Sequence, residues 1–509
     1  MLSRVRSFVL TGIDARPCEV EVDLDESAIE RATVVGLPDT AVRESLERVR
    51  AAVGNSGYRF PPGRLLVNLA PADVRKEGPV YDLPIAAGLL RAAGVAQSGL
   101  DPRGMLMAGE LALDGRVRPV RGVIAAAHLA ASQGLRGVIV PQENAPEAAV
   151  VPGIEVYAVG SLTELVGLLS GGLEPSPHPP VDVAGAIERD EAPLDFAEIR
   201  GQEAVKRGLL VAAAGGHNAL MVGPAGTGKT MMARALPGIL PPLRPDEAID
   251  ITRVHSAAGQ LNGDGGSGLV TRRPVRAPHH TASSAAIIGG GAIPGPGEIS
   301  LAHRGVLFLD ELPEFPRAVL DTLRQPLEEG AVTISRSHST ARFPARFMLI
   351  AAMNPTAKGD LPTDAAGRRA MDRYLSRLSR PLLDRIDVHL EAPAVPWRAL
   401  ADSPAGTGTA EMRERVLGAR CVQHARQGES LNAQLTGREL DRFAPLTEEA
   451  QAMLGEALTE LGLSARAYDK IRRLARTIGD LDADHAPSEP VGLPHLAEAV
   501  QYRLLDRQH

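Results

Sequence analysis

The stretch Asn218-Ala-Leu-Met-Val222, followed by Gly223-Pro-Ala-Gly-Thr-Gly-Lys-Thr230, decides the fold of this 509-residue chain. The second part matches the pattern Gly-x-x-x-x-Gly-Lys-Ser/Thr in full, and the apolar run before it predicts a buried strand. Glycines let backbone N–H groups turn toward phosphates, Lys229 reaches the β- and γ-phosphate oxygens, and Thr230 offers a hydroxyl to Mg²⁺. The helix expected to begin near Lys229 aims its positive end at the same phosphates. The pattern predicts an ATP site formed by Gly223, Pro224, Ala225, Gly226, Thr227, Gly228, Lys229 and Thr230.

A second motif, Gly305-Val-Leu-Phe-Leu-Asp-Glu311, ends an apolar run with two adjacent carboxylates. It predicts a parallel strand whose carboxyl end faces the nucleotide. Asp310 can hold Mg²⁺ directly or through water, and Glu311 can orient or deprotonate the attacking water. We therefore expect Thr230 and Asp310 to be the Mg²⁺ ligands. Glu311 and Lys229 are expected to be catalytic, so that ATP is hydrolysed and not only bound.

A third apolar strand, Phe347 to Met353, ends in Asn354-Pro355. An amide at the end of a neighbouring strand can bridge the γ-phosphate and the attacking water, which is the role called sensor 1 in ATPases of the AAA+ class. An Asn before Pro also fits a simple turn. The catalytic assignment of Asn354 therefore depends on the two preceding motifs.

Length, composition and charge limit the remaining possibilities. A chain of 509 residues predicts two to four domains, and 44% hydrophobic with 23% charged residues is typical of a globular protein. No apolar run is long enough to span a bilayer, and the first residues lack a signal peptide. Cys18 and Cys421 lie too far apart in sequence for a disulfide framework or a zinc site. These features predict a cytoplasmic protein with no membrane partner, and a net charge of −7 means that any DNA contact must be local.

The chain is predicted to be of the α/β class, with a P-loop core built on a parallel sheet, a C-terminal helical lid and an N-terminal α+β domain. In the N-terminal part, strands are expected at Glu19–Leu24, Arg64–Leu69 and Gly137–Pro141, and helices at Asp39–Val53 and Val123–Gln133, the first capped by Asp39. A proline-rich stretch predicts a linker between the first two domains. The predicted boundaries are 1–170 for the first domain, 171–194 for the linker, 195–396 for the ATPase core and 410–509 for the lid.

Two segments of the core have distinct patterns. Residues 256–300 are dominated by glycine and proline, and they lengthen the connection between the phosphate loop and Asp310. They predict a functional insertion without regular structure. Further on, Val332–Ile334 and a strand toward Phe347, separated by the polar stretch Ser335–Thr340, predict a β-hairpin.

Several longer strings resemble those of the magnesium-chelatase-like AAA+ ATPases, and in particular of the ComM (YifB) competence group. They are Arg276–His280, Gly289–Gly291, Pro296–His303, Leu307–Phe315 and Leu323–Glu328. The similarity covers nearly the whole chain. It implies a homo-hexameric ring with ATP sites between subunits, acting in branch migration of recombining DNA during natural transformation, with recombination proteins as further partners.

The same resemblance implies roles for single residues. Arg385, within Leu382–Asp387, is similar to the arginine that reaches the γ-phosphate of the neighbouring subunit; a local salt bridge with Asp384 or Asp387 is the alternative. Arg466 is similar to the sensor 2 arginine of a lid helix, with Arg472, Arg473 and Arg476 as competing candidates. Ile199-Arg-Gly-Gln202 resembles the segment that packs on adenine, so Ile199 and Gln202 are expected nucleotide contacts.

The first domain resembles the protease domain of Lon, on the strings Lys76–Pro79, Gly109-Glu110, Gly115–Val117 and Pro141–Asn144. Where that protease carries its nucleophilic serine this chain has Val80, and where it carries the activating lysine this chain has Ile124. A Ser–Lys dyad requires a hydroxyl and an amine. The resemblance therefore implies a non-catalytic domain with a scaffold or regulatory role.

Many relatives place paired cysteines just after the sensor asparagine, but Asn354–Asp360 contains none, so no structural zinc is predicted. The neighbouring His279 and His280 are expected to pack the insertion or face a pore and not to bind metal, because they lack further ligands.

The leading hypothesis is a ring ATPase that translocates DNA, with Arg336, His338 and Arg342 on the predicted hairpin as its DNA contacts. A magnesium-chelatase-type ATPase motor and a protein-remodelling ATPase are the alternatives. The chelatase motor lacks the extra Lon-like domain. An ATP-dependent protease is excluded by Val80 and Ile124.

Overall fold

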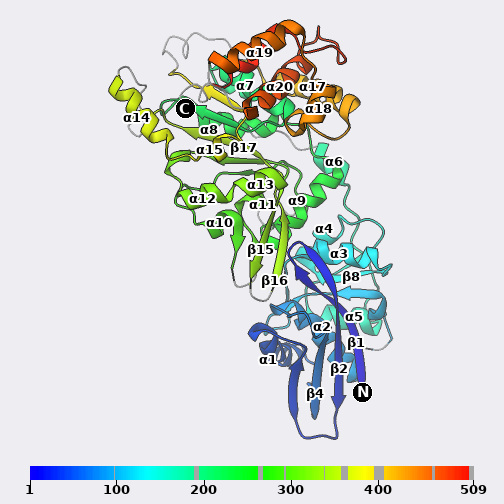
Figure 1. Ribbon diagram of the computed structural model, residues 1–509. Coiled ribbons are helices and arrows are strands. Elements are labelled where there is room, and N and C mark those ends of the chain that lie inside the picture. The colour runs from blue at the N-terminus through cyan, green and yellow to red at the C-terminus, as the bar shows by residue number, and fades with distance from the viewer. Residues whose placement is uncertain are drawn as a thin grey trace.

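A computed structural model of the protein describes residues 1–96, 98–188, 194–261, 268–291, 294–336, 339–356, 365–394, 406–460 and 465–503. Figure 1 shows an elongated molecule, with the N-terminal sheet domain at one end, the parallel-sheet core in the middle and the C-terminal helices at the other end. Among the described helices, none is both long enough and apolar enough to cross a membrane.

The N-terminal domain is built on a seven-stranded sheet of order β3-β4-β2-β1-β5-β8-β9. Strand β2 pairs antiparallel with β1 and β4, whereas β5, β8 and β9 run parallel to one another. The strands are β1 (Leu2–Thr11), β2 (Asp14–Asp25), β3 (Arg31–Val35), β4 (Arg64–Ala70), β5 (Met105–Met107), β8 (Gly137–Pro141) and β9 (Glu155–Val159). The main helices are α1 (Thr40–Asn55), α2 (Asp82–Ala92), α3 (Val123–Ser132) and α5 (Leu162–Ser170).

The elements expected in this domain are confirmed. The strand predicted at Glu19–Leu24 lies within β2, and the strand predicted at Arg64–Leu69 lies within β4. The third predicted strand, Gly137–Pro141, has the same bounds as β8. The Asp39 side chain accepts a hydrogen bond from the Val42 N–H at 2.7 Å, which caps α1 as expected.

The core contains a five-stranded sheet of order β11-β14-β17-β10-β18, in which all neighbouring strands run parallel. Its strands are β10 (Ala219–Val222), β11 (Val275–Arg276), β14 (Val306–Leu309), β17 (Met348–Met353) and β18 (Val388–Glu391). The register pairs Val222 with Met353 and Leu309 with Ala351. The phosphate loop, Asp310 and Asn354 therefore all begin at the same edge of the sheet.

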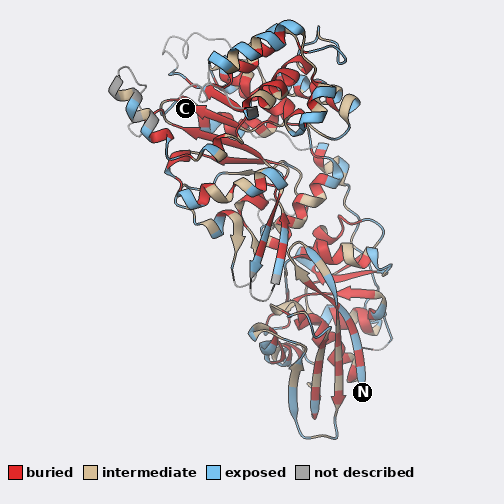
Figure 2. Cartoon of the chain, in the orientation of Figure 1, coloured by how far each residue is buried: buried red, intermediate tan, exposed pale blue. Residues whose placement is uncertain are grey.

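Each face of this sheet is covered by different helices. Ala219 and Met221 belong to a hydrophobic cluster shared with α7 (Glu203–Gly215) and the C-terminal helices. Leu220 and Val222 belong to a second cluster, shared with α10 (Ser284–Ile288) and α12 (Arg317–Thr322). The alternation follows from the two-residue period of a strand, and Figure 2 shows the buried sheet between its covering layers.

The predicted insertion 256–300 is not without regular structure. It begins in the last turn of α9 (Pro245–Ala258), and it holds β11, α10, the short pair β12 (Gly289–Gly290) and β13 (Gly295–Pro296), and α11 (Glu298–Leu301). Strand β11 is an edge strand of the core sheet, paired with β14. The expectation was wrong because two-residue strands between glycines and prolines leave no hydrophobic period to detect.

The predicted hairpin is confirmed as β15 (Ala331–Arg336) and β16 (Ser339–Pro344), with Thr333 opposite Arg342. The turn was expected at Ser335–Thr340, but β15 continues to Arg336 and β16 begins at Ser339. It lies against the turn between β1 and β2, where Gly12 approaches the backbone of Arg342 and Ile13 packs on the core cluster. The N-terminal domain thus lies against the middle of β16, at Ala341 and Arg342.

The predicted linker 171–194 contains a helix, α6 (Val183–Glu188). Its Ile187 is buried in a cluster that joins Ile124 and Val138 of the first domain to Ile251 of α9. No proline lies between Pro180 and Pro193, so the apolar residues of this interval are free to form a helix.

The C-terminal region is helical, as predicted. Its helices are α17 (Thr409–Gln427), α18 (Gly437–Phe443), α19 (Glu448–Glu460), α20 (Ala465–Asp480) and α21 (Leu493–Gln501). Met412, Ile471 and Leu496 from three of them enter the cluster that covers the core sheet. The lid and the core therefore share one hydrophobic interior.

A buried polar junction also joins lid and core. The Asp387 carboxylate, just before β18, lies 3.2 Å from Lys470 Nζ of α20 and 3.3 Å from His217 Nδ1. His217 Nε2 in turn lies 2.8 Å from the Thr477 hydroxyl of α20. Burial raises the pKa of Asp387, but the charge of Lys470 and the contact with His217 outweigh it and hold that pKa below its usual value.

We predict that Asp387→Asn destabilises the protein by about 3–5 kcal/mol at pH 7, because Lys470 is left buried without its counter-ion. Since the folded-state pKa of Asp387 is lowered, this stabilisation is present above the ordinary aspartate pKa of about 4 and is lost as the pH falls further. Thermal unfolding midpoints of both proteins at pH 7 and pH 3 test this, and the difference should shrink at pH 3.

Asp384→Asn is the matched control, because Asp384 pairs at 2.9 Å with a largely exposed Arg466 and such a pair contributes at most about 1 kcal/mol. Equal midpoints for Asp387→Asn and wild type would show that the junction contributes nothing.

Candidate ATP-binding and hydrolysis site

The phosphate loop joins β10 to α8 (Lys229–Ala235) as the sequence predicts. Gly226 and Gly228 have φ values of 79° and 85°, in the left-handed region that favours glycine. Gly223 donates its N–H to Met353 O at 3.1 Å. This bond aligns the loop with the end of β17.

The Lys229 ammonium is buried and donates to Gly223 O and Pro224 O, both at 2.6 Å. It also lies 3.4 Å from Asn354 Oδ1. Burial lowers the pKa of Lys229, and the charge of Asp310 opposes that shift. The structure thus brings Lys229 and Asn354 together, although they are far apart in the sequence.

Thr230 and Asp310 meet at the same edge. The Thr230 hydroxyl donates to Asp310 Oδ2 at 3.0 Å. A hydroxyl and a carboxylate at this spacing supply the hard oxygen atoms that Mg²⁺ requires. These two residues fit the metal, and they are the ones that would hold it.

Glu311 has an unusual backbone conformation, with φ of 52° in a residue other than glycine. Its N–H donates to Asp310 Oδ1 at 2.9 Å, and its carboxylate is half exposed. The Oε2 atom lies 3.3 Å from Nδ1 of His280. The sequence did not indicate this contact, and His280 was expected to pack the insertion or face a pore.

Ile199 and Gln202 lie against the phosphate loop. Ile199 is buried, and its Cγ2 is 3.9 Å from the position that a Cβ would take at Gly228. Gln202 Nε2 donates to Pro393 O at 2.7 Å and to Thr227 O at 3.4 Å. Both residues predicted to contact adenine therefore flank the loop.

The Arg385 guanidinium forms an ion pair with Glu328 and donates to Pro381 O. The local salt bridges considered for it are not formed, because Asp384 pairs with Arg466 and Asp387 with Lys470. Within the described residues, neither Arg385 nor Arg466 forms a hydrogen bond or an ion pair with the phosphate loop.

The competing arginines of α20 serve the lid itself. Arg472 pairs with Asp441, Arg473 donates to Leu435 O, and Arg476 is buried against Asp480. Arg466 differs because its side chain is 72% exposed, and it pairs with Asp384. The structure therefore favours Arg466 over its neighbours as a candidate contact.

Comparison with other proteins identifies the family. The chain is 43% identical to the "Uncharacterized protein YifB" of Salmonella typhimurium over 512 residues, which cover 99% of this chain and 98% of the relative. It is also 43% identical to the "Competence protein ComM" of Haemophilus influenzae, with the same coverage of both chains. The chain belongs to the magnesium-chelatase-like ATPases.

Family models match all three parts of this magnesium-chelatase-like ATPase. The model described as "Magnesium chelatase, subunit ChlI" matches residues 195–400, that of "Subunit ChlI of Mg-chelatase" residues 20–144, and that of the ChlI C-terminal region residues 406–503. The "Magnesium-chelatase 38 kDa subunit" of Rhodobacter capsulatus is 31% identical over 195 residues, which cover 35% of this chain and 54% of the relative.

The residues predicted to contact DNA lie on the hairpin of this ATPase. Arg342 is exposed on β16, and the backbone of Arg336 lies near the hairpin tip, paired with Ser339. His338 lies outside the described residues. The structure thus places Arg342 and Arg336 on a hairpin that packs on the core cluster and lies beside the β1–β2 turn.

In the N-terminal domain, Val80 and Ile124 pack in the same hydrophobic cluster. The Ile124 N–H donates at 2.8 Å to the buried carboxylate of Glu147. Both positions therefore lie in an apolar environment.

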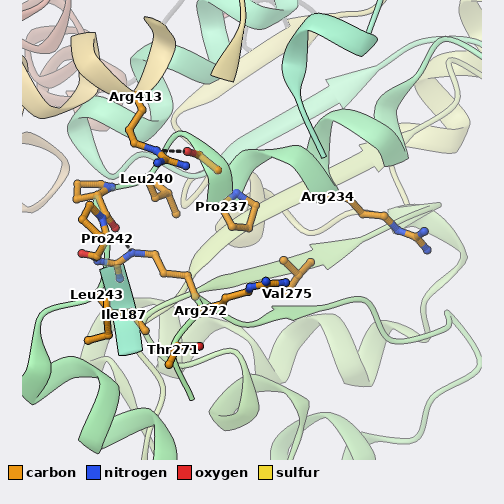
Figure 3. A pocket seen from close by; sticks show the side chains of 13 residues that line it. Ile187, Arg234, Pro237, Leu240, Pro242, Leu243, Thr271, Arg272, Val275 and Arg413 are labelled. Carbon is orange, nitrogen blue, oxygen red and sulfur yellow. Dashed lines mark hydrogen bonds between the residues drawn. The ribbon is translucent and has the colours of Figure 1, made fainter. Parts of the chain in front are cut away.

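A separate small cavity of about 120 Å³ lies between core and lid, and its lining side chains are shown in Figure 3. Arg413 of α17 donates to Gly238 O at 2.6 Å. Arg273 donates to Pro241 O at 2.7 Å and pairs with Glu247 at 2.9 Å. Arg413 thus joins α17 of the lid to the core segment at Gly238, and Arg273 joins two segments of the core. The cavity between these segments is part of the core–lid junction.

We predict that Lys229→Ala and Glu311→Gln abolish ATP hydrolysis by different routes. Lys229→Ala removes the cation at the phosphates and should weaken nucleotide binding roughly 10- to 100-fold. Glu311→Gln should bind ATP like the wild type, because Glu311 acts on water, yet its kcat should fall by about 100-fold or more. Nucleotide titrations and steady-state ATPase assays measure both effects.

Glu329→Gln is the control, since Glu329 is an exposed carboxylate that bonds only Gln325 among the described side chains. If Glu311→Gln hydrolyses ATP at the wild-type rate, the role assigned to Glu311 is wrong.

Proposed function

We propose that this protein is an ATP-hydrolysing ring motor that acts on DNA, moving branch points during recombination in natural transformation. The observation that carries the proposal is the 43% identity to a protein named for competence over 99% of this chain. The convergence of Lys229, Asp310 and Glu311 at one sheet edge supports the hydrolytic part.

In the proposed reaction, water attacks the γ-phosphorus of ATP, the bond to the bridging oxygen breaks, and ADP and phosphate leave. Glu311 orients the water and accepts its proton. Lys229 contacts the β- and γ-phosphates, and Asn354 beside it positions the water. Mg²⁺, held by Thr230 and Asp310, would neutralise phosphate charge when bound.

In the proposed ring, Arg385 contributes to the ATP site of a neighbouring subunit. Arg385 forms no bond with its own phosphate loop among the described residues, and neighbouring Arg324 and Arg466 add positive charge around it. An arginine supplied by a neighbouring subunit stabilises transition-state charge and is worth roughly 10³- to 10⁵-fold in rate. We therefore assign Arg385 to the site of the next subunit in a homo-hexamer, with Arg466 close to it.

The DNA contact is assigned to the hairpin. With a net charge of −7 the protein has no overall attraction for DNA. Arg336 and Arg342, repeated around a ring, would multiply local positive charge in a central channel. A chelatase motor remains the alternative, but the matches to two magnesium-chelatase 38 kDa subunits cover 45% and 35% of the chain.

We predict that Arg385→Ala binds ATP but hydrolyses it poorly, and that mixing it with Glu311→Gln restores part of the activity. Restoration follows because some interfaces in mixed rings combine an intact Glu311 with an intact Arg385. ATPase assays across mixing ratios measure this. A mixture no more active than its parents, with subunit exchange confirmed by labelled protein, would contradict action between subunits.

We predict that single-stranded or branched DNA stimulates the wild-type ATPase, and that Arg336→Ala plus Arg342→Ala removes this stimulation while the basal rate survives. Each lost phosphate contact should lower the salt slope of log affinity by about 0.9 for duplex or 0.7 for single strands. DNA binding measured across a salt titration gives that slope.

The control variant is Arg415→Ala plus Arg438→Ala, which makes the same charge change on exposed residues of α17 and α18. Unchanged DNA affinity in the hairpin variant would move the search to the segment around Arg276. A wild-type ATPase indifferent to DNA would favour the chelatase or protein-remodelling alternatives.

A further inference from the structure

The segment after β11 reaches the catalytic edge of the sheet. Strand β11 pairs in parallel with β14, with Arg276 opposite Leu307. Because parallel strands end at the same edge, the chain leaving β11 arrives where Asp310 and Glu311 follow β14. His280 is four residues beyond the end of β11.

His280 contacts the carboxylate of Glu311 directly. Its Nδ1 lies 3.3 Å from Glu311 Oε2, and the two side chains are 31% and 50% exposed. The two groups form an ion pair when the imidazole is protonated, and a proton on Nδ1 gives this nitrogen the character of a donor. In the part of the chain that the structure describes, no other side chain pairs with the Glu311 carboxylate.

The imidazole of His280 is itself held in place. Its ring lies 4.1 Å from the ring of His279 and meets Phe315 edge-on at 6.5 Å. His279 Nδ1 is bonded to the Thr281 hydroxyl at 2.8 Å. At the start of the segment, the Arg276 guanidinium binds both oxygens of Glu298, at 2.6 and 2.8 Å. These contacts make His280 a fixed partner for Glu311.

Glu311 needs such a partner more than an ordinary catalytic carboxylate does. Its φ of 52° places the backbone in the left-handed region, and half of its side chain is in solvent. Without a second contact, the carboxylate would sample several rotamers, and few of them would meet a water at the γ-phosphate.

We propose that His280 is a positioning residue for ATP hydrolysis, which holds the Glu311 carboxylate in the orientation that contacts the attacking water. His280 acts through Glu311 and does not touch the nucleotide. The segment between β11 and α10 thereby becomes part of the hydrolytic site, and the inference rests on the proposed ATPase function.

The test compares His280→Ala, His280→Asn and His280→Gln in the full-length protein. The amide nitrogen of asparagine can take the place of Nδ1, whereas that of glutamine lies nearer the place of Nε2. We expect His280→Ala to lower kcat roughly 10- to 100-fold with ATP affinity unchanged. His280→Asn should recover most of the rate and His280→Gln less.

His424→Ala, which removes an exposed histidine of α17, is the control and should keep the wild-type rate. In the background of Glu311→Gln, His280→Ala should cause no further loss, because the group it positions is already inactive. Thermal midpoints and ATP titrations on each variant separate positioning from misfolding.

The inference is overturned if His280→Ala keeps the wild-type kcat, if its loss of activity equals a loss of ATP affinity or of folded protein, or if His280→Asn recovers nothing. A wild-type protein without ATPase activity, with or without DNA, would instead overturn the proposed function and the inference with it.

Discussion

The register of three parallel strands is the constraint on which the site depends. Strands β10 and β17 end together, with Val222 opposite Met353, and β14 ends two residues earlier, with Leu309 opposite Ala351. A shift by one residue would turn Asp310 and Asn354 to opposite faces, because side chains alternate along a strand. The buried faces set this register, since the apolar residues of β10 alternate between two hydrophobic clusters. The positions of Asp310 and Asn354 at the sheet edge thus depend on the packing of apolar side chains within the strands.

The segment carrying Arg385 is tied to the same sheet by its backbone. Asn218, the residue before β10, donates from Nδ2 to Arg385 O at 2.9 Å and accepts the N–H of Leu349 at 2.8 Å. From the lid side, Lys470 donates to Ile386 O at 3.0 Å. The position of Arg385 is therefore set jointly by the phosphate-loop strand and by α20. Because Lys470 belongs to α20, a movement of the lid would shift the backbone beside Arg385.

The sequence predicted the parts of the site whose chemistry is local. The glycines, Lys229 and Thr230 must be adjacent to cradle phosphate, and an apolar run before Asp310 indicates a strand by itself. Strand β11 could not be predicted, because a two-residue strand is too short to show an alternation of apolar and polar residues. It is a strand only because it pairs with β14. The contact of His280 with Glu311 follows from that pairing, so it was hidden for the same reason. Helix α6 was missed because nearby prolines dominated the composition.

The N-terminal domain is joined to the ATPase core through a buried carboxylate. Glu147 is buried where this domain meets α9, and it accepts hydrogen bonds from the Ile124 N–H, Asn144 and the Ser256 hydroxyl. Burial raises the pKa of Glu147, and these bonds oppose that shift. Since Ser256 belongs to the core, separating the domains would leave Glu147 without one partner in an apolar setting, which is costly. Together with the β1–β2 turn beneath the hairpin, this contact holds the first domain against the element proposed to bind DNA. The first domain is therefore packed against both α9 and the hairpin of the core.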